Sequence, residues 1–459
     1  MSGIFPQLSN INQITGDALK AILHYKTFKK KYKFLLESQW WSKERLEEYQ
    51  LDQLNKLMHH AYENVPYYTK LFNNLSLKPR DIQDFKDLQK LPYLTKQIVK
   101  ENINDLKAKN YPRRKFEFIT SGGSTGKPIV IYLHKGVAEA EYLAYNQIFL
   151  DRTNCQFKNK HIHLFGFDNI CKQRVFGRIM ALSSFFINDK KLPFYIKKIR
   201  KFKPRFIIAF PSAITILAKF MDKNNVKSFP SIKTVICGGE TIYDWQRKLI
   251  EKSFQCRVHN LYSLAEVVVF ATSCEYSNNY HVYPEYGITE LIGKDGKIIT
   301  ENRKMGEIVG TGFTNFIFPL IRYKTEDIGI YTNQKCRCGR KHLILENIIG
   351  RIQQFIISKS QYLYHLTGIY GLVAHCSQNV KECQFYQDTE GEINLYIVKD
   401  NNYSNKDEEL IRKSFKKKFR EEINLKVIYI ENIPKTIRGK HQFLIQKLPV
   451  ESYKNDKIS

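Results

Sequence analysis

The sequence predicts an α/β protein with a large, layered N-terminal domain that includes a β-rich subdomain, and a small, mobile α+β C-terminal domain. Three patterns along the chain support this fold class. Strand-like and helix-like segments alternate through the middle, further strand-like segments follow, and the chain finishes with a strand–helix–strand pattern. A chain of 459 residues can bury two unequal cores, so two domains are expected.

The elements are justified by periodicity and by turn signals, taken in chain order. Apolar residues at helical spacing from Leu51 to Val65 predict a helix that ends before Pro66. Asp295-Gly296 is a hairpin turn signal between strand-like segments. The other predicted elements are helices at 137–152, 212–223, 242–254 and 405–422, and strands at 161–167, 205–210, 234–238, 257–262, 306–331, 394–399 and 426–431.

The charge of the chain is strongly basic. Lys and Arg number 73 against 45 Asp and Glu, which gives a formal net charge of +28. No DNA- or RNA-binding signature accompanies this charge, so nucleic acid is not an expected partner. Solvated faces are the favoured interpretation, and an acidic carrier protein, an anionic lipid surface or a polyanionic glycan stay open as alternatives.

The sequence predicts a cytoplasmic protein. The N-terminal residues lack the basic region and apolar run of a secretory signal. The most apolar run, residues 206–221, is interrupted by Pro211 and is too short to span a bilayer, so no transmembrane segment is expected, although peripheral membrane contact stays open. The nine Cys are mostly single within apolar segments, which indicates reduced thiols.

A loop rich in Gly, Ser and Thr lies between two β-prone segments in FITSGGSTGKPIVIY, residues 118–132. Its glycines let backbone N–H groups approach an anion, and its hydroxyls and lysine add donors and a positive charge. The expected ligand is a polyphosphate, and a flexible turn between hairpin strands is the alternative. The predicted phosphate-binding residues are Ser121, Gly122, Gly123, Ser124, Thr125, Gly126 and Lys127.

This loop differs from the phosphate loop of the P-loop NTPases. Ser121 stands where that motif begins with Gly, and Pro128 follows the lysine where a Ser or Thr is needed. A strand-like segment, and no helix, comes next. The sequence therefore excludes the Walker interpretation.

Four further motifs follow the loop: YSLAE at 262–266, RYKTED at 322–327, Gly350-Arg351, and PKTIRGK at 434–440. In this order they resemble the motifs of the adenylate-forming superfamily, the acyl-CoA synthetase and luciferase-like enzymes. The chain looks most like the branch of phenylacetate–CoA ligases and their relatives in capsule polysaccharide biosynthesis, from about Leu51 to Leu448. The resemblance implies a ligase that uses ATP and Mg²⁺ to convert a carboxylic acid to an acyl-adenylate and releases pyrophosphate.

The resemblance assigns roles to individual residues. Tyr262 is expected to lie against adenine, Glu266 to hold Mg²⁺, Asp327 to bind the ribose hydroxyls, and Lys440 to meet the carboxylate and α-phosphate oxygens. Lys435, in the same loop as Lys440, is expected to be exposed. Gly239 and Glu240 belong to a nucleotide-adjacent turn, although Glu240 could equally be a helix-start carboxylate near Thr241. Arg351 belongs to a hinge motif.

The hinge motif places the domain boundary between 1–350 and 351–459, and the resemblance implies that the C-terminal domain turns about it. The acyl group would then pass to CoA, to a carrier-protein thiol or to a glycan precursor. Five positions depart from the family motifs: Ser263 and Glu326 replace glycines, Ala265 replaces a hydroxyl residue, and Gln353 and Gln354 replace the acidic residues that usually follow the hinge motif. Losing one hydrogen bond would cost about 1–3 kcal/mol. These departures support the alternative of a non-catalytic nucleotide-binding scaffold in polysaccharide assembly.

A possible metal site is separate from these motifs. Cys274, His281, Cys336 and Cys338 supply three thiolates and one imidazole, a set that suits a closed, tetrahedral, structural Zn²⁺ site, with His342 as a spare imidazole. Some relatives of the phenylacetate–CoA ligases carry a comparable zinc. Separate reduced cysteines and a surface histidine are the alternative.

Overall fold

The computed structural model describes residues 24–120, 129–174, 177–351, 355–366, 369, 373, 379–436 and 439–450. Its N-terminal region is helical, with α3 (Tyr25–Ser38), α4 (Lys43–Asn64), α5 (Pro66–Asn74) and the short α6 (Lys96–Glu101). The helix predicted to end before Pro66 ends at Asn64, and proline then occupies the first position of α5, where its missing N–H costs nothing.

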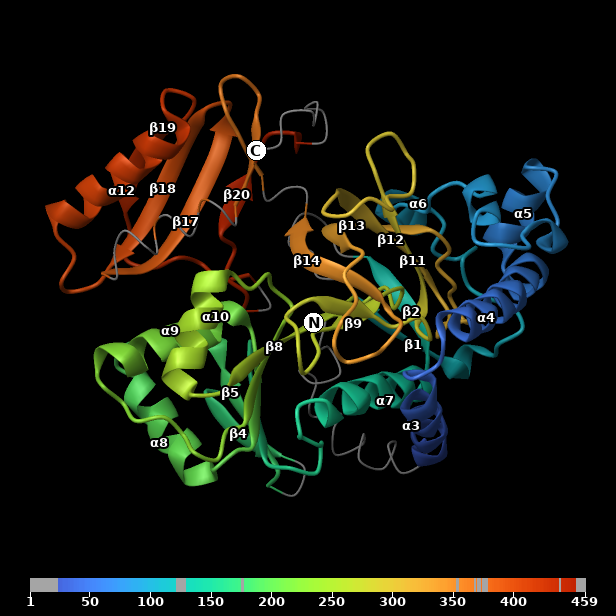
Figure 1. Cartoon of the computed structure of the whole chain (residues 1–459), viewed down its shortest axis with the longest axis horizontal. Helices are drawn as coiled ribbons and strands as arrows, with labels where there is room; N and C mark the ends of the chain where they lie inside the picture. The colour runs from blue at the N-terminus through green and yellow to red at the C-terminus, as the bar shows by residue number, and fades with distance from the viewer. Residues whose placement is uncertain are drawn as a thin grey trace.

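The centre of the molecule is one twelve-stranded sheet in the order β11-β12-β13-β14-β10-β9-β8-β7-β6-β3-β5-β4. Strands β5, β3, β6, β7 and β8 run parallel, and helices cover them (Figure 1). The bounds in this half are β3 (His161–Phe165), β4 (Cys171–Arg174), β5 (Ile179–Ser183), β6 (Phe206–Ala209), β7 (Thr234–Gly238) and β8 (Arg257–Ser263), with α7 (Val137–Asp151), α8 (Leu192–Phe202), α9 (Pro211–Lys223) and α10 (Asp244–Phe254).

The predicted β-rich part continues this same sheet as its antiparallel half. Gly296, in the predicted Asp295-Gly296 turn, has φ +77°, the left-handed conformation that glycine accepts readily. The strands of this half are β9 (Phe270–Thr272), β10 (Tyr280–Val282), β11 (Gly287–Ile292), β12 (Met305–Gly312), β13 (Tyr323–Thr332) and β14 (Leu343–Arg351).

The C-terminal part has a second, four-stranded sheet in the order β19-β18-β17-β20, with α12 beside it (Figure 1). Its buried side chains form a hydrophobic cluster apart from those of the large sheet. Among the described residues before β15, only Tyr243 contributes a buried side chain to this cluster. The bounds are β15 (Phe355–Ile357), β16 (Leu363–His365), β17 (Val380–Thr389), β18 (Glu392–Lys399), α12 (Asn405–Phe419), β19 (Asn424–Tyr429) and β20 (Leu444–Gln446). The predicted fold class, mixed α/β with a C-terminal α+β region, is confirmed.

Two features differ from the sequence expectations. Helix α8 was not predicted, because the segment is rich in lysine and arginine. These residues make the helical spacing of the apolar residues Leu192, Ile196 and Ile199 hard to recognise in the sequence. Strands β4, β5, β9, β10, β14 to β17 and β20 were also missed. Among the described residues, no helix combines the length and apolar character that crossing a bilayer requires.

Candidate functional site

A pocket of about 490 Å³ lies where the large sheet meets the C-terminal chain. Its walls come from the ends of β7, β8, β13 and β14, from Thr436 and from residues 440–449. Six residues predicted from the sequence line it: Gly239, Glu240, Tyr262, Asp327, Arg351 and Lys440.

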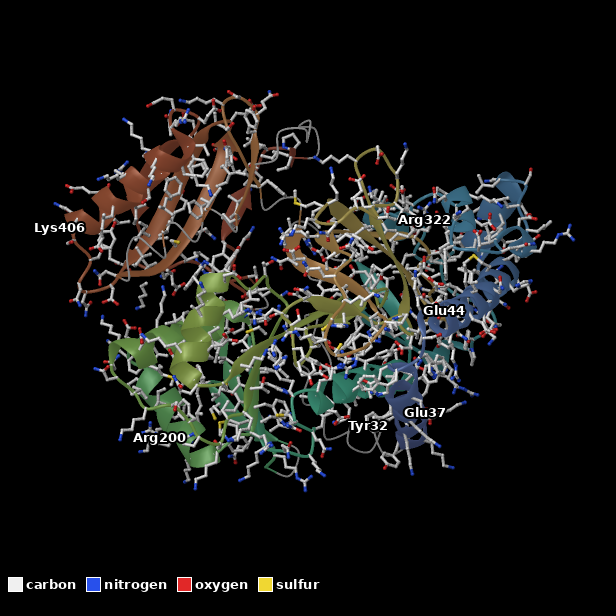
Figure 2. All side chains as sticks on the ribbon, viewed as in Figure 1. Tyr32, Glu37, Glu44, Arg200, Arg322 and Lys406 are labelled. Carbon is white, nitrogen blue, oxygen red and sulfur yellow. The ribbon has the colours of Figure 1, made fainter. Side chains whose placement is uncertain are left out.

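The topology explains why these distant residues meet. Strands β7 and β8 are parallel neighbours, so their carboxyl ends, just before Gly239 and at Tyr262, open at the same edge of the sheet. Strands β13 and β14 are antiparallel with Asp327 opposite Arg351. Arg322, labelled in Figure 2, holds the start of β13 through a buried bidentate pair with Glu290, with N···O distances of 3.1 and 2.9 Å.

Tyr262, Asp327 and Arg351 form one connected group. The Tyr262 hydroxyl donates to Asp327 Oδ2 at 2.8 Å, and Arg351 Nε lies 3.9 Å from Asp327 Oδ1. Burial raises the pKa of Asp327, and the Arg351 charge and the Tyr262 hydrogen bond oppose that rise. This arrangement holds a carboxylate at the pocket wall, where it can accept hydrogen bonds from a ligand.

Glu266 lies beside this group although it does not line the pocket. Its Oε1 accepts a hydrogen bond from the Tyr323 hydroxyl at 3.3 Å. Burial raises its pKa, and the nearby Arg351 charge lowers it. A half-buried carboxylate of this kind suits a hard divalent cation.

Lys440 enters the pocket from the C-terminal chain. Its Nζ donates to the Gly239 carbonyl at 2.6 Å, and its backbone N–H donates to Thr436 Oγ1 at 3.1 Å. The preceding Gly439 has φ +76°, and a Cβ there would lie 2.7 Å from Gly166 Cα. Glycine is therefore required for the loop to approach the sheet this closely.

Glu240 does not cap the start of helix α10, which was the alternative interpretation of this residue. Helix α10 begins at Asp244, whereas Glu240 accepts hydrogen bonds from Ser212 N and Ser212 Oγ, at 3.0 and 3.1 Å, in the first turn of α9. It also accepts one from His441 N at 3.1 Å. Glu240 thus connects α9 to the residue that follows Lys440.

Lys435 is not the exposed lysine that the sequence suggested. It donates a hydrogen bond to the Ser184 carbonyl, and Ser184 Oγ donates to the Gly439 carbonyl at 3.0 Å. Ser184 and His441 contact the Lys440 loop, and sequence reasoning missed both. His441 follows the PKTIRGK motif directly, which was a usable signal, while nothing in the sequence around Ser184 indicates its position.

The predicted phosphate loop, Ser121–Lys127, lies outside the described residues. The strands on either side are present as predicted, since β1 (Phe116–Thr120) pairs antiparallel with β2 (Val130–His134). Thr120 is opposite Val130, so the chain leaves and re-enters this hairpin at adjacent positions.

The departures from the family motifs have structural correlates. Glu326, in place of glycine, keeps a left-handed backbone with φ +64°. Ala265 is 4% exposed. Ser263, also in place of glycine, lines the pocket, and its Oγ lies 3.4 Å from the Tyr142 hydroxyl of α7.

The predicted metal ligands converge in space. The ligand atoms of Cys274, His281, Cys336 and Cys338 all lie within 4.8 Å of one another. The Cys274 and Cys336 sulfurs are 3.4 Å apart, and Cys338 Sγ is 3.8 Å from His281 Nε2. A tetrahedral zinc with bonds of about 2.0–2.3 Å requires separations of roughly this size. The four residues therefore fit Zn²⁺.

The surroundings of this cluster are closed. Arg340, just after the Cys-x-Cys turn, donates to both Glu275 carboxylate oxygens, at 2.9 and 3.1 Å, and to Gln39 Oε1 at 3.0 Å. His342 is buried 5.8 Å from the His281 ring, measured between centroids, but is outside the four-residue set. The cluster is thus built into the sheet and tied to the N-terminal helices.

Comparison with known proteins places this geometry in context. The model of the CapK C-terminal domain matches residues 356–447. The chain is 26% identical to Protein CapK of Staphylococcus aureus over 416 residues, covering 87% of this chain and 89% of that protein. It is 25% identical to the phenylacetate-coenzyme A ligase of Thermus thermophilus over 334 residues, covering 70% and 74%.

A solved structure shares the fold. The 2-hydroxyisobutyryl-CoA ligase, in the postadenylation state with R3-HIB-AMP, superposes with a TM-score of 0.73 over 90% of this chain and 93% of that one, at 14% identity. The homologues are thus CapK and phenylacetate–CoA ligases, and the fold is that of the adenylate-forming ligases.

Proposed function

We propose that this chain, a homologue of CapK and the phenylacetate–CoA ligases with the fold of the adenylate-forming enzymes, activates a carboxylic acid as an acyl-adenylate. ATP is the second substrate and pyrophosphate is the leaving group. The observation that carries the proposal is the meeting of Lys440 with Tyr262, Asp327 and Arg351 around one pocket. Two cations, a hydroxyl and a carboxylate around one pocket can bind the charged and hydrogen-bonding groups of a nucleotide and of a carboxylate substrate.

The proposed roles follow from the chemistry of each group. Asp327 accepts hydrogen bonds from the ribose hydroxyls, Tyr262 packs against adenine, and the loop Ser121–Lys127 binds the phosphates. Lys440 stabilises the charge that develops at the α-phosphorus as the carboxylate attacks. Attack forms the C–O–P anhydride and breaks the bond from the α-phosphorus to the bridging oxygen, which leaves with pyrophosphate.

Two metals complete the proposal. Glu266 would hold Mg²⁺, which would neutralise phosphate charge when bound. Cys274, His281, Cys336 and Cys338 would hold Zn²⁺ in a structural role, which the converging ligand atoms support.

We place a domain boundary at Gly350-Arg351. The separate hydrophobic cluster of the C-terminal sheet supports it, and so does Gly350 with φ +88°. Turning about this point would withdraw Lys440 and admit an acceptor for the second half-reaction. CoA is the acceptor that the relatives' names favour, and a carrier thiol or a glycan precursor is compatible with the chemistry. A cytoplasmic location is part of the proposal, and the expected use of ATP and CoA and the free cysteines support it.

The test is pyrophosphate–ATP exchange across a panel of carboxylic acids. We expect exchange that depends on both ATP and one class of acid. Ala265 in place of a hydroxyl residue and Glu326 in place of glycine favour the alternative of a nucleotide-binding scaffold. ATP binding without exchange for any acid would support that alternative.

A further inference from the structure

His441, the residue after Lys440, is held at two points that belong to different parts of the molecule. Its backbone N–H donates to Glu240 Oε1 at 3.1 Å, in the turn that follows β7 of the large sheet. Its ring Nε2 donates to the Cys383 carbonyl at 2.9 Å, in β17 of the C-terminal sheet. Because the two residues share one backbone, these contacts also fix the point from which the Lys440 side chain leaves the loop.

The His441 side chain lies at a polar junction between α9, α10 and β17. A cavity of about 20 Å³ at this junction has side chains from all three elements in its walls, together with His441. The other charged residues in the walls are Lys219 of α9 and Lys381 and Glu382 of β17. A cavity of this size has room for about one water molecule, so these groups are packed around the imidazole.

Lys219 holds the start of β17 on α9. This half-buried lysine donates from Nζ to the carbonyls of Val380 and Lys381, at 3.0 and 3.5 Å. An amine withdrawn from water needs such acceptors, so the two contacts stabilise the docked position of the strand. The Cys383 carbonyl, which accepts from the His441 ring, follows two residues later in β17.

The His441 ring is neutral at pH 7. Burial lowers its pKa, and the charges of Lys435 and Lys219 lower it further, while the Glu382 carboxylate, 3.7 Å from Nδ1, opposes this shift. Since a carbonyl oxygen only accepts, the single proton of the neutral ring is on Nε2, where it meets the Cys383 carbonyl. The ring therefore acts here as a hydrogen-bond donor.

The Lys440 amine has a closely defined position at the other end of this chain of contacts. Its Nζ donates to the Gly239 carbonyl at 2.6 Å and lies 5.6 Å from the centre of the Phe210 ring. A Cβ on Gly239, which has φ +79°, would lie 3.0 Å from that ring and 3.5 Å from Nζ, so glycine is favoured where these groups converge. Misplacing a catalytic group by about 1 Å can cost about 10²-fold in rate, so the amine is sensitive to where the loop lies.

We propose that His441 and Lys219 are positioning residues for Lys440. Lys219 holds the start of β17 on α9, β17 holds the His441 ring, and His441 sets where the Lys440 amine lies relative to the reacting carboxylate. The inference rests on the proposed adenylation. It gives a role in that step to α9, although Lys219 belongs to none of the sequence motifs and His441 lies just beyond the last one.

The test measures ATP binding and pyrophosphate–ATP exchange, with the acid that gives the fastest exchange, for His441→Leu, His441→Gln and Lys219→Met. His441→Leu should lower kcat of exchange by about 10²-fold, with the Kd and the KM for ATP nearly unchanged. His441→Gln should recover about tenfold of this loss, because its amide can donate to the Cys383 carbonyl. Lys219→Met should lower kcat by roughly tenfold through the loss of its hydrogen bonds.

Lys223→Met is the matched control. Lys223 lies one turn further along α9 and also pairs across the junction, with Asp400, but its side chain is 50% exposed. An exposed ion pair contributes little, so this variant should keep nearly wild-type exchange. All rates are expressed per ATP-binding site, which removes any loss of folded protein from the comparison.

Three results would overturn the inference while leaving adenylation intact. They are unchanged exchange in the His441→Leu and Lys219→Met proteins, equal losses in the Lys219→Met and Lys223→Met proteins, and no recovery in the His441→Gln protein. Absence of exchange by the wild-type protein with every acid in a broad panel would instead count against the proposed function.

Discussion

The two ends of the β13–β14 strand pair carry two different kinds of site. At one end, Cys336 and Cys338 lie in the connection between the strands, with ligand atoms that converge on Cys274 and His281 of the same sheet. At the other end, Asp327 and Arg351 face a pocket whose lining also includes Lys440 of the C-terminal chain.

The cysteine cluster therefore lies within the large sheet, whereas the pocket is lined by the large sheet together with the C-terminal chain. The cysteine cluster is held by strand pairing and by Arg340, so it forms when the large sheet forms. The pocket depends on a few polar contacts across the junction, such as Lys440 to Gly239 and His441 to Glu240. Such contacts are individually weak, which is compatible with the domain movement that we propose.

The largest expected effect is at the cysteine end. Cys336→Ser should abolish stoichiometric zinc in protein purified without added metal and lower the free energy of unfolding by several kcal/mol, because metal-binding energy stabilises the folded state. Elemental analysis and thermal unfolding measure the two effects.

Cys171→Ser is the control, since Cys171 is a partly exposed free thiol outside the cluster. ATP should still bind the Cys336→Ser protein below its unfolding temperature. Full zinc content in that variant would refute the zinc assignment.

The next effect is at the pocket end. Lys440→Ala should reduce adenylation by about 10²–10³, the usual loss for one preorganised electrostatic donor, with nucleotide binding nearly unchanged. Acyl transfer from a supplied acyl-adenylate should fall much less, if the lysine has left the pocket by then. Pyrophosphate release and single-turnover transfer separate these steps.

The control is Lys416→Ala, which removes the same charge from an exposed position in α12. Lys435 is unsuitable for this purpose because it contacts Ser184. Equal losses in the Lys440 and Lys416 variants, or no loss in either, would refute the role of Lys440 and the domain-turning mechanism.

The sequence predicted the two ends unequally well. Strand β7 is predicted with its observed bounds, because it is a short run rich in β-branched residues that ends at glycine, and β8 is predicted to within one residue. The four metal ligands are predicted from their residue types alone. Their convergence follows from the antiparallel pairing of strands in the large sheet, which the periodicity of the sequence does not specify. Helix α8 and the contacts of Ser184 were not predictable, since both depend on tertiary packing of segments that look like charged or neutral surface.

A third prediction concerns the stability of the large sheet that carries both sites, tested separately from the two sites themselves. His161 in β3 is 1% exposed and stacks on Phe206, and burial lowers its pKa from 6.5 to about 4. The unfolded chain therefore takes up a proton first as the pH falls. The stability from neutral His161 is complete above pH 6.5 and is lost toward about pH 4, by about 3 kcal/mol in total.

Urea unfolding at several pH values measures this loss, and His161→Phe should reduce its slope. If acid affects only the cysteine end, zinc release should precede unfolding and the His161→Phe protein should show the wild-type slope. That result would contradict the assignment of acid sensitivity to the sheet.

The smallest effect is expected at Glu326, at the pocket end of β13. A side chain in the left-handed region costs about 1–2 kcal/mol, and Glu326 has φ +64°. Glu326→Gly should relieve this strain, although glycine returns about 0.5–1 kcal/mol through the flexibility of the unfolded chain. A net stabilisation of up to about 1 kcal/mol should appear in urea unfolding.

The Glu326 charge also raises the pKa of Asp327, so its removal should favour the ionised carboxylate and modestly increase nucleotide affinity. Glu326→Ala separates the two causes, because it removes the charge but keeps a Cβ in the strained conformation. We expect the alanine variant to gain affinity without gaining stability. Equal stabilisation by alanine and glycine would show that the Glu326 carboxylate, and not its left-handed backbone, lowers the free energy of unfolding at this end of the strand pair.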